Sequence, residues 1–442
     1  MRNFFAFFTF GLLCVLGTTS RSHAQINTLP TSNQAAAAPM GSHPIAPANW
    51  AFDCIYWSDD CGLNGSWTPT KSRPGTVRLW QSGTEWALLN TGENSYDWKY
   101  LDTWLDLIAE HQPSQVIYTF GLVPCWISTA SCDGKGWGMG HNFSPAPPSD
   151  LTSNGSPAFE EYVRALVQHC SPSGHCVKDH IKYWEMWNEA NLSNFWTGTP
   201  EQLYDMFKSV IPIIRNNVPG AVISTPPVCG GDTSWMTNWL ALENTNGRLS
   251  DYFGIHIYMR DDAPETRMSM LRSMLNVKNN NGWTTTPWMN TETGYDNLTF
   301  SCSTQFSAED CRGQLVRWHV LQYAYQGGAG GAFLVGWYKW DSITSDQDLD
   351  PFYYTMMEWL SGATFSASCT NQGTVWSCPL TQADGTKSLI VWNTAGRSHY
   401  KPAAEYTRYK KFNAWFGGAN KTVAPGESIV IGVVPFMFEA GT

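Results

Sequence analysis

The sequence predicts a (β/α)8 TIM barrel followed by a small all-β, sandwich-like domain. Between residues 52 and 337, short and almost continuously apolar segments alternate with amphipathic helical segments. Strands of this kind are typical of a parallel sheet that is covered by helices. After about residue 362 the helical pattern stops, and strand-like segments follow one another across turns rich in glycine and asparagine.

Eight segments have the length and composition of buried strands: residues 52–57, 76–80, 115–121, 181–188, 221–225, 252–258, 286–292 and 331–337. Six helices are expected between them: one through Leu101, Trp104, Leu105 and Ile108, and others near 157–169, 200–217, 234–244, 264–279 and 307–326. This series fits a barrel better than an open doubly wound sheet. The glycine-rich segment 327–331 precedes a strand, so it indicates a turn and not a dinucleotide-binding loop.

The N-terminal residues 1–24 have the features of a secretory signal peptide. Arg2 is followed by an apolar run from Phe4 to Gly17 that is too short to span a bilayer, and small residues precede Gln25. Residues 25–47 are expected to be a linker, 48–362 the catalytic barrel and 363–442 the β domain. We therefore expect a soluble monomer that is secreted, either to the outside of the cell or to a periplasm.

The charge balance argues against two classes of partner. Lys and Arg number 27 against 37 Asp and Glu, which gives a net charge of −10. Nucleic acids and anionic membranes both require a basic surface, so neither is an expected partner. Aromatic residues make up 14% of the chain, as many as charged residues, and they include 23 Trp. Aromatic side chains serve either as core or as flat surfaces for a ligand.

The cysteines suggest an oxidising compartment. Five close pairs are predicted to form disulfides: Cys54/Cys61, Cys125/Cys132, Cys170/Cys176, Cys302/Cys311 and Cys369/Cys378. Cys14 leaves with the signal peptide, and Cys229 is left over as an expected free, buried thiol. Neither a CxxC nor an HExxH motif occurs, so no metal or organic cofactor is expected. Six N-x-S/T sequons are consistent with export: Asn64, Asn142, Asn154, Asn191, Asn297 and Asn420.

Two glutamates follow or end predicted strands, at the edge where a barrel places its active site. Glu189 follows Trp187 and Asn188 at the end of the fourth strand, and Glu292 ends the seventh. Other polar or aromatic residues at this edge are Arg78, His256, Tyr258, Trp337 and Trp340. A pair of carboxyl groups can cleave a glycosidic bond, one acting as the acid and the other as nucleophile or base. The alternative is that each glutamate caps a helix or pairs with an arginine.

The segment KYWEMWNEANLSNFWTGT resembles the acid/base signature W-N-E-P-N of clan A retaining glycoside hydrolases. TVRLWQSGTEWALLN, YDWKYLDTWLDLIAEHQPSQVIYTFGLVPCW and MNTETGY extend the match, and together these segments resemble family 39 and its bacterial and fungal relatives. It runs from Arg78 to Trp340 and slightly beyond. One departure is Ala190 in place of the proline, which changes the rigidity of the turn but removes no chemical group.

The resemblance implies a role for each residue of the site. Glu189 would be the general acid/base and Glu292 the nucleophile. Asn188 would hold the sugar 2-hydroxyl, Tyr258 and His256 would orient the nucleophile and the sugar, Arg78 would keep the nucleophile ionised, and Trp337 would be the platform under the sugar.

Further tryptophans at or after strand ends are candidates for additional sugar subsites, although about half of them are expected to be core: Trp57, Trp80, Trp126, Trp196, Trp288 and Trp340. The β domain could bind carbohydrate through Trp392 or Trp415, but packing against the barrel is the favoured interpretation.

The sequence therefore predicts a secreted retaining glycosidase that acts on a polysaccharide or oligosaccharide, in an endo fashion. The alternatives are an exo-acting enzyme of the xylosidase or arabinosidase type, a transglycosidase, and a barrel that binds carbohydrate without cleaving it. A serine hydrolase is excluded by the absence of a G-x-S-x-G motif.

Overall fold

The structure is a computed structural model that describes residues 50–54, 75–130, 132, 143–259, 263–295, 302, 306–338, 349–412 and 420–441. The predicted signal peptide, the predicted linker, and Trp57, Trp340 and Trp415 lie outside these residues.

Eight strands form one parallel sheet in the order β10-β11-β12-β1-β2-β5-β8-β9. They are β1 (Trp50–Cys54), β2 (Thr76–Leu79), β5 (Gln115–Thr119), β8 (Tyr183–Glu185), β9 (Val222–Ser224), β10 (Phe253–His256), β11 (Trp288–Thr293) and β12 (Leu334–Trp337). Each of the eight predicted strand segments contains one of them or overlaps it. The edge strands β9 and β10 share no ladder among the described residues, but Ser224 and Tyr252 form an isolated parallel bridge between them.

The two faces of this sheet differ because side chains alternate along each strand. One face packs on the helices and carries residues such as Val77, Tyr118 and Val335. The opposite face carries a small separate apolar cluster around Ile117, Met289 and Leu334. Two residues closer to the carboxyl ends of β5 and β11, Thr119 and Thr291 occupy this face, and both are buried polar residues.

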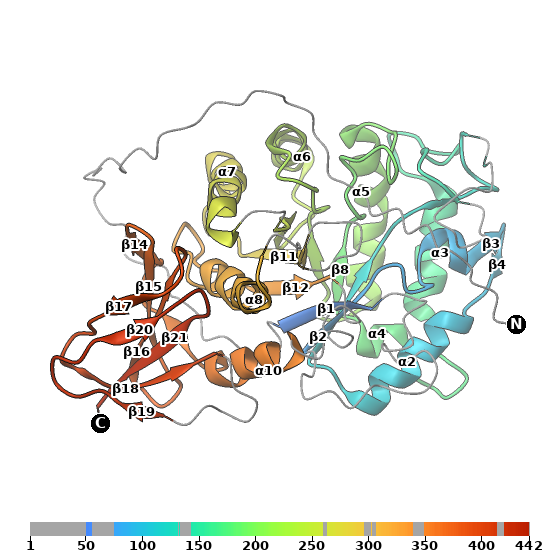
Figure 1. The fold of residues 1–442 in the computed structure, drawn as a ribbon. Coiled ribbons are helices and arrows are strands. Elements are labelled where there is room, and N and C mark those ends of the chain that lie inside the picture. The colour runs from blue at the N-terminus through green and yellow to red at the C-terminus, as the bar shows by residue number, and fades with distance from the viewer. Residues whose placement is uncertain are drawn as a thin grey trace, which may run out of the picture.

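Helices follow the strands and surround the sheet (Figure 1). They are α1 (Trp86–Leu89), α2 (Lys99–His111), α3 (Pro157–Gln168), α4 (Val177–His180), α5 (Pro200–Asn217), α6 (Thr233–Asn246), α7 (Pro264–Asn280), α8 (Ala308–Tyr323) and α10 (Leu349–Leu360). All six predicted helices are present, and among the described residues α1, α4 and α10 are additional. Their starts are set by local signals: in α5, the Thr199 hydroxyl and the Gln202 side chain form a capping box ahead of Pro200.

Two short antiparallel pairs lie in the connections that follow β2 and β5. They are β3 (Asn90–Gly92) with β4 (Ser95–Tyr96), and β6 (Val123–Pro124) with β7 (Phe143–Ser144). The sequence analysis did not predict them. Strands of two or three residues are too short to produce a recognisable alternation of polar and apolar residues.

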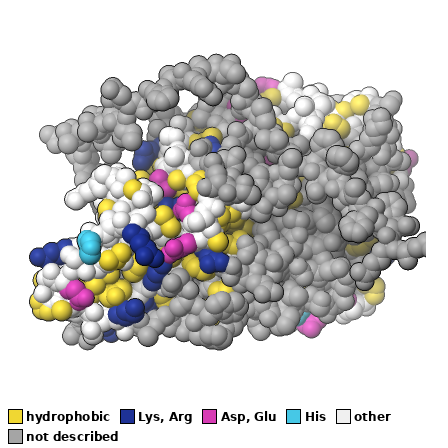
Figure 2. Space-filling model, viewed as in Figure 1, with side chains coloured by type: hydrophobic (Ala, Val, Ile, Leu, Met, Phe, Trp, Pro, Cys, Tyr) yellow, Lys and Arg dark blue, Asp and Glu magenta, His cyan; other side chains and the backbone are white. Residues whose placement is uncertain are grey.

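The C-terminal residues form two antiparallel sheets, as predicted. The larger contains β13 (Thr364–Phe365), β14 (Thr370–Gln372), β15 (Val375–Thr381), β16 (Lys387–Asn393), β18 (Tyr406–Lys411), β19 (Lys421–Thr422) and β21 (Phe436–Ala440), and the smaller β17 (Ser398–Tyr400) and β20 (Ile429–Ile431). A small apolar cluster that includes Val391, Ile431 and Phe438 joins the two sheets. On the face of this domain seen in Figure 2, Lys and Arg side chains are interspersed with apolar ones.

The β domain packs against the helices beside it, α8 and α10 (Figure 1). Trp392 is fully buried, and its indole N–H donates to the Glu265 carboxylate of α7 at 2.6 Å. Phe412 contacts Trp359 of α10 with ring centroids 4.7 Å apart. Trp392 therefore belongs to a domain interface and is not a surface platform for a sugar.

Four of the five predicted disulfides are present in the described residues, namely Cys125–Cys132, Cys170–Cys176, Cys302–Cys311 and Cys369–Cys378. The side chains of the fifth pair, Cys54 and Cys61, lie outside the described residues. The prediction for Cys229 was wrong, because this residue is disulfide-bonded and not a free thiol. Pairing by spacing recognises only cysteines that are close in the sequence, whereas the fold brings distant ones together.

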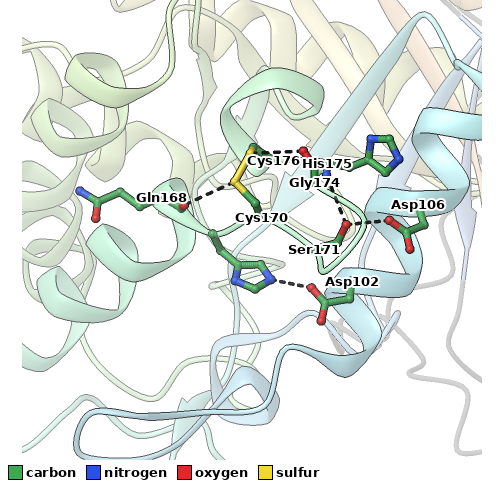
Figure 3. The surroundings of a disulfide bond; sticks show 9 residues. Asp102, Asp106, Gln168, Cys170, Ser171, Gly174, His175 and Cys176 are labelled. Atoms are coloured by element: carbon green, nitrogen blue, oxygen red, sulfur yellow. Dashed lines mark hydrogen bonds and ion pairs between the residues drawn. A yellow bond between two sulfur atoms is a disulfide. The ribbon is translucent and has the colours of Figure 1, made fainter.

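The disulfide loop of Cys170–Cys176 is tied to helix α2 by polar contacts (Figure 3). His169 Nε2 lies 2.6 Å from a carboxylate oxygen of Asp102, and the Ser171 hydroxyl donates to Asp106 at 2.7 Å. This loop precedes α4 and strand β8, so these contacts help to fix the start of the strand that leads to Glu189.

The four disulfides between described cysteines fit an extracellular protein. Within the described ranges, no helix has both the length and the apolar character needed to cross a membrane. The side chain of Asn191, in one of the predicted glycosylation sequons, is already hydrogen-bonded. Its oxygen accepts from the Cys229 N–H at 3.0 Å, and its NH2 group donates to the Cys229 C=O at 3.1 Å.

Candidate active site

Glu189 lies in a tight turn directly after strand β8, and the backbone of this turn is strained. Trp187 and Glu189 have φ angles of 68° and 43°, in the left-handed region that residues other than glycine seldom occupy. Such conformations cost about 1–3 kcal/mol each and persist where surrounding contacts enforce them. Here the buried Trp187 indole donates to the C=O of Phe195 at 3.0 Å and packs edge-on against Trp196. The turn therefore holds Glu189 in one place.

Glu292 faces Glu189 from the end of strand β11, where the strand contains a β-bulge. The pairing of β11 is irregular with both of its neighbours: His256 pairs with Glu292 after Ile255 pairs with Asn290, and a second shift separates Asn290 from Thr293. A bulge places two residues opposite one and redirects a side chain. As a result, the neighbouring residues Thr291 and Glu292 both contact the site, although strict alternation would put them on opposite faces.

The two glutamates predicted to be catalytic lie close together. One carboxyl oxygen of Glu189 and one of Glu292 lie within 4.8 Å of each other and of a ring nitrogen of His256. Both residues are nearly buried, with 4% and 7% of their surface exposed.

Glu292 is held by a guanidinium and a phenol. Arg78 Nη1 donates to Glu292 Oε2 at 2.8 Å, and the Tyr258 hydroxyl donates to Glu292 Oε1. Burial raises the pKa of the Glu292 carboxyl, while Arg78 and Tyr258 oppose that rise. The predicted contact of Arg78 with Glu292 is present. Arg78 lowers the pKa of Glu292, but burial of the carboxyl group raises it by more.

His256 lies between the two carboxyl groups and is fully buried. Its Nδ1 is 2.9 Å from Glu189 Oε1 and 3.7 Å from Glu292 Oε2, and its Nε2 is 3.1 Å from the Thr291 hydroxyl. Burial, and to a lesser degree the positive charge of Arg78, lower the pKa of this histidine well below its usual value. The imidazole is therefore neutral at physiological pH.

A third buried carboxyl group, Glu185, lies beneath the pair. It accepts hydrogen bonds from Arg78 Nε at 3.0 Å, from Arg78 Nη2, from Thr119 at 3.0 Å and from the Thr291 hydroxyl at 2.5 Å. The sequence analysis missed Glu185 as a site residue, and it also missed Thr119 and Thr291. The available signal was a charged residue inside an otherwise apolar strand segment, which needs a partner when it is buried.

Asn188 is buried beside this network. Its side-chain oxygen accepts from Arg78 Nη2 at 2.7 Å, so Arg78 contacts Glu185, Asn188 and Glu292 at once. The predicted contact of Asn188 with a sugar 2-hydroxyl stays a prediction. Tyr338, which the sequence analysis did not select, packs edge-on against Tyr258 and donates to Gln81 at 2.8 Å.

The structure separates the predicted aromatic platforms into two groups. Trp80 and Trp196 are almost fully buried, and Trp80 packs edge-on against Phe195. Trp288 is fully buried, with its indole donating to the C=O of Gly330 at 2.9 Å. Trp126 is 38% exposed, with its indole N–H bonded to the C=O of Asn90 at 3.1 Å. Among these four, Trp126 alone offers a substantial surface to a ligand.

Trp337, the predicted platform under the sugar, is fully buried. Trp337 has no exposed surface and stacks on His319 of α8, with ring planes 17° apart. It belongs to the large apolar cluster together with Val335. Alternation along β12 places both residues on the helix-covered face, and the platform role of Trp337 stays a prediction.

One group of described side chains has donors close enough for a metal ion, and it consists of Glu189, His256 and Glu292. The guanidinium of Arg78 lies 2.8 Å from Glu292, and its positive charge would repel a cation bound there. The same three residues suit acid–base chemistry without a metal.

Comparisons with known proteins agree with this interpretation at the level of fold. No family model matches the sequence. A β-xylosidase from Geobacillus stearothermophilus is 31% identical over 113 residues, which cover 25% of this chain and 21% of that enzyme. The chain thus matches about a fifth of the length of this relative.

Solved structures match over nearly the whole chain. A glycoside hydrolase family 30 subfamily 8 xylanase from Clostridium acetobutylicum is 14% identical, with a TM-score of 0.58, and the match covers 91% of this chain and 98% of the xylanase. A family 39 β-xylosidase from Caulobacter crescentus is 12% identical, with a TM-score of 0.56 and coverage of 93% and 98%. A glucosidase from Croceicoccus marinus is 11% identical, with a TM-score of 0.57 and coverage of 92% and 98%. The chain therefore has the fold of clan A glycoside hydrolases, as the sequence motifs suggested.

Proposed function

We propose that this protein is a retaining glycoside hydrolase. The observation that carries the proposal is the approach of Glu189 and Glu292 to within 4.8 Å at the carboxyl end of a parallel sheet. Retaining enzymes place their two carboxyl groups about 5–5.5 Å apart, whereas inverting enzymes leave about 6.5–9.5 Å for a water molecule. The proposal includes a barrel in which the Ser224–Tyr252 bridge is the closing contact between β9 and β10.

In the first step, a carboxylate oxygen of Glu292 attacks the anomeric carbon while Glu189 donates its proton to the departing glycosidic oxygen. The glycosidic bond breaks and a glycosyl ester with Glu292 forms. In the second step, Glu189 takes a proton from water, whose oxygen attacks the anomeric carbon and releases the Glu292 carboxylate. Tyr258 and Arg78, which donate to separate oxygens of Glu292, hold it in one orientation for the attack.

We propose a neutral polysaccharide or oligosaccharide as the substrate, with β-linked xylose as the first candidate. The matches to a xylanase and to β-xylosidases support this sugar, and the net charge of −10 disfavours an acidic glycan. The exposed indole of Trp126 supports an additional subsite and hence endo action. The disulfides and the N-terminal sequence support secretion, and we propose that the protein acts alone, without a metal or organic cofactor.

The test begins with the purified chain on a panel of plant, fungal and bacterial polysaccharides, with products identified by mass spectrometry. Oligosaccharides released by the wild type but not by Glu292→Ala would support a glycosidase, and their length distribution would separate endo from exo action. A 2-deoxy-2-fluoro glycoside with an activated leaving group should add the mass of one glycosyl unit to the peptide that contains Glu292.

The same experiment distinguishes the alternatives. A protein that binds a glycan without releasing any product, together with no trapped ester, would indicate a non-catalytic carbohydrate-binding barrel. Transfer of the glycosyl unit to an added sugar, in preference to water, would indicate a transglycosidase.

A further inference from the structure

We propose that Glu185 and Thr291 are positioning residues that fix which nitrogen of His256 carries the proton, and thereby keep the carboxyl group of Glu189 protonated before catalysis. This inference rests on the proposed function, since it concerns the acid of that reaction.

The Thr291 hydroxyl contacts two groups. It lies 2.5 Å from Glu185 Oε2 and 3.1 Å from His256 Nε2. A hydroxyl group has one hydrogen to donate. Glu185 is already paired with the guanidinium of Arg78 and receives the Thr119 hydroxyl, so its oxygens act as acceptors. The single Thr291 hydrogen is therefore directed to Glu185.

The orientation of the Thr291 hydroxyl determines the histidine tautomer. With its hydrogen directed to Glu185, the Thr291 oxygen can only accept from His256, so Nε2 carries a hydrogen. His256 is fully buried and close to Arg78, and both effects favour the neutral ring. A neutral imidazole with a hydrogen on Nε2 has a lone pair on Nδ1.

The lone pair on Nδ1 determines which group carries the hydrogen between His256 and Glu189. Nδ1 lies 2.9 Å from Glu189 Oε1, and two acceptors at that distance would repel each other. A hydrogen bond forms there only if Glu189 carries a proton on Oε1 and donates it. The sequence of donors is thus Glu189 to His256, His256 to Thr291, and Thr291 to Glu185.

The charges around His256 favour the same state. The charge of Arg78 of β2 acts on the ring, while Glu189 after β8 and Glu292 of β11 lie 2.9 and 3.7 Å from Nδ1. Glu185 of β8 is connected to the ring through Thr291, and the Tyr258 hydroxyl donates to Glu292. With Glu189 ionised, three buried carboxylates would share one guanidinium. Protonation of Glu189 reduces this number to two, both in direct contact with Arg78.

The test measures the tautomer directly and then its consequence. Nitrogen-15 spectra of histidine-labelled protein distinguish protonated from unprotonated ring nitrogens, and His256→Asn assigns the signal. The variant Thr291→Val removes the hydroxyl while keeping the shape, Thr291→Ser restores it as the matched control, and Glu185→Gln removes the terminal acceptor charge. Circular dichroism and Tm verify that each variant is folded.

In the wild type we expect a protonated Nε2 and an unprotonated Nδ1. In Thr291→Val this preference weakens, and the alkaline limb of the kcat/KM profile moves to lower pH. We expect kcat/KM to fall about tenfold for glycosides with poor leaving groups, part of the roughly 10²–10⁴-fold that a general acid supplies. Activated aryl glycosides should lose less than about twofold, because their departure needs little proton transfer. Thr291→Ser should behave as the wild type.

A wild-type His256 protonated on Nδ1, or on both nitrogens, would overturn the proposal. The same holds for a Thr291→Val variant whose histidine signals and alkaline limb are unchanged. The spectra do not depend on turnover, so a chain without glycosidase activity would refute the proposed function while the tautomer still decides this inference.

Discussion

Glu85 provides a quantitative test of how this fold buries charge. It lies at the start of α1, is almost inaccessible, and receives the backbone N–H of Ser82 at 3.2 Å on one carboxyl oxygen. The other oxygen has no hydrogen-bond partner among the described residues. Burial therefore raises the pKa of Glu85 from 4.5 to about 7, although backbone N–H groups partly oppose the rise.

The sign of the effect on stability follows from the protons bound. Between pH 4.5 and about 7 the folded state retains a proton that the unfolded state has released, so rising pH favours unfolding. Each unit of pKa difference corresponds to about 1.4 kcal/mol, so this residue should lower the free energy of unfolding by about 3 kcal/mol across that range. Below pH 4.5 Glu85 is protonated in both states and this stability is fully present. It is lost as the pH rises to about 7, where the folded state also releases the proton.

The variant Glu85→Gln keeps the shape but cannot ionise. Relative to the wild type, the free energy of unfolding of the variant should be about 3 kcal/mol higher at pH 7.5 than it is at pH 4.5. Urea unfolding at four pH values measures it, with the exposed Glu93→Gln as a control. A difference that stays constant with pH would refute the reasoning.

Four further outcomes follow from the proposed site. Glu189→Ala should lose about 10²–10⁴-fold in kcat on substrates with poor leaving groups, and added azide should restore turnover of activated ones. Trp126→Ala should lower kcat/KM on long oligosaccharides but leave aryl monoglycosides nearly unchanged; an equal loss on both would exclude a distal subsite. Dialysis against EDTA should not change activity, which metal-dependent catalysis would contradict. Trp392→Phe should lower the free energy of unfolding by about 1.5–3 kcal/mol, because the Glu265 carboxylate loses the indole donor, and an unchanged denaturation midpoint would contradict this.

The resemblance in the sequence predicted a catalytic pair, Glu189 and Glu292, and the structure places the two close together. The alternation of apolar strands with helices predicted the eight strands and six of the helices. Both signals are local. A buried strand between helices is apolar along its length, and the W-N-E segment is continuous in the chain. Sequential disulfides such as Cys125–Cys132 were predictable for the same reason.

Other features depend on contacts between distant segments, and only the tertiary structure decided them. Cys229 is disulfide-bonded although no cysteine lies near it in the sequence. Trp337 lies on the helix-covered face of β12, so its position at the end of a strand did not indicate its environment. Glu185 belongs to the site because it pairs with Arg78, which is 107 residues away in the chain.

The bulge in β11 is the clearest case. The sequence determined that MNTET would be a buried strand ending near a glutamate. Strict alternation then allows only one of Thr291 and Glu292 to face the site, and the irregular pairing with β10 and β12 allows both. Register is set by the neighbouring strands and not by the strand itself. The fold therefore decided that Glu292 meets Arg78 while Thr291 connects His256 to Glu185.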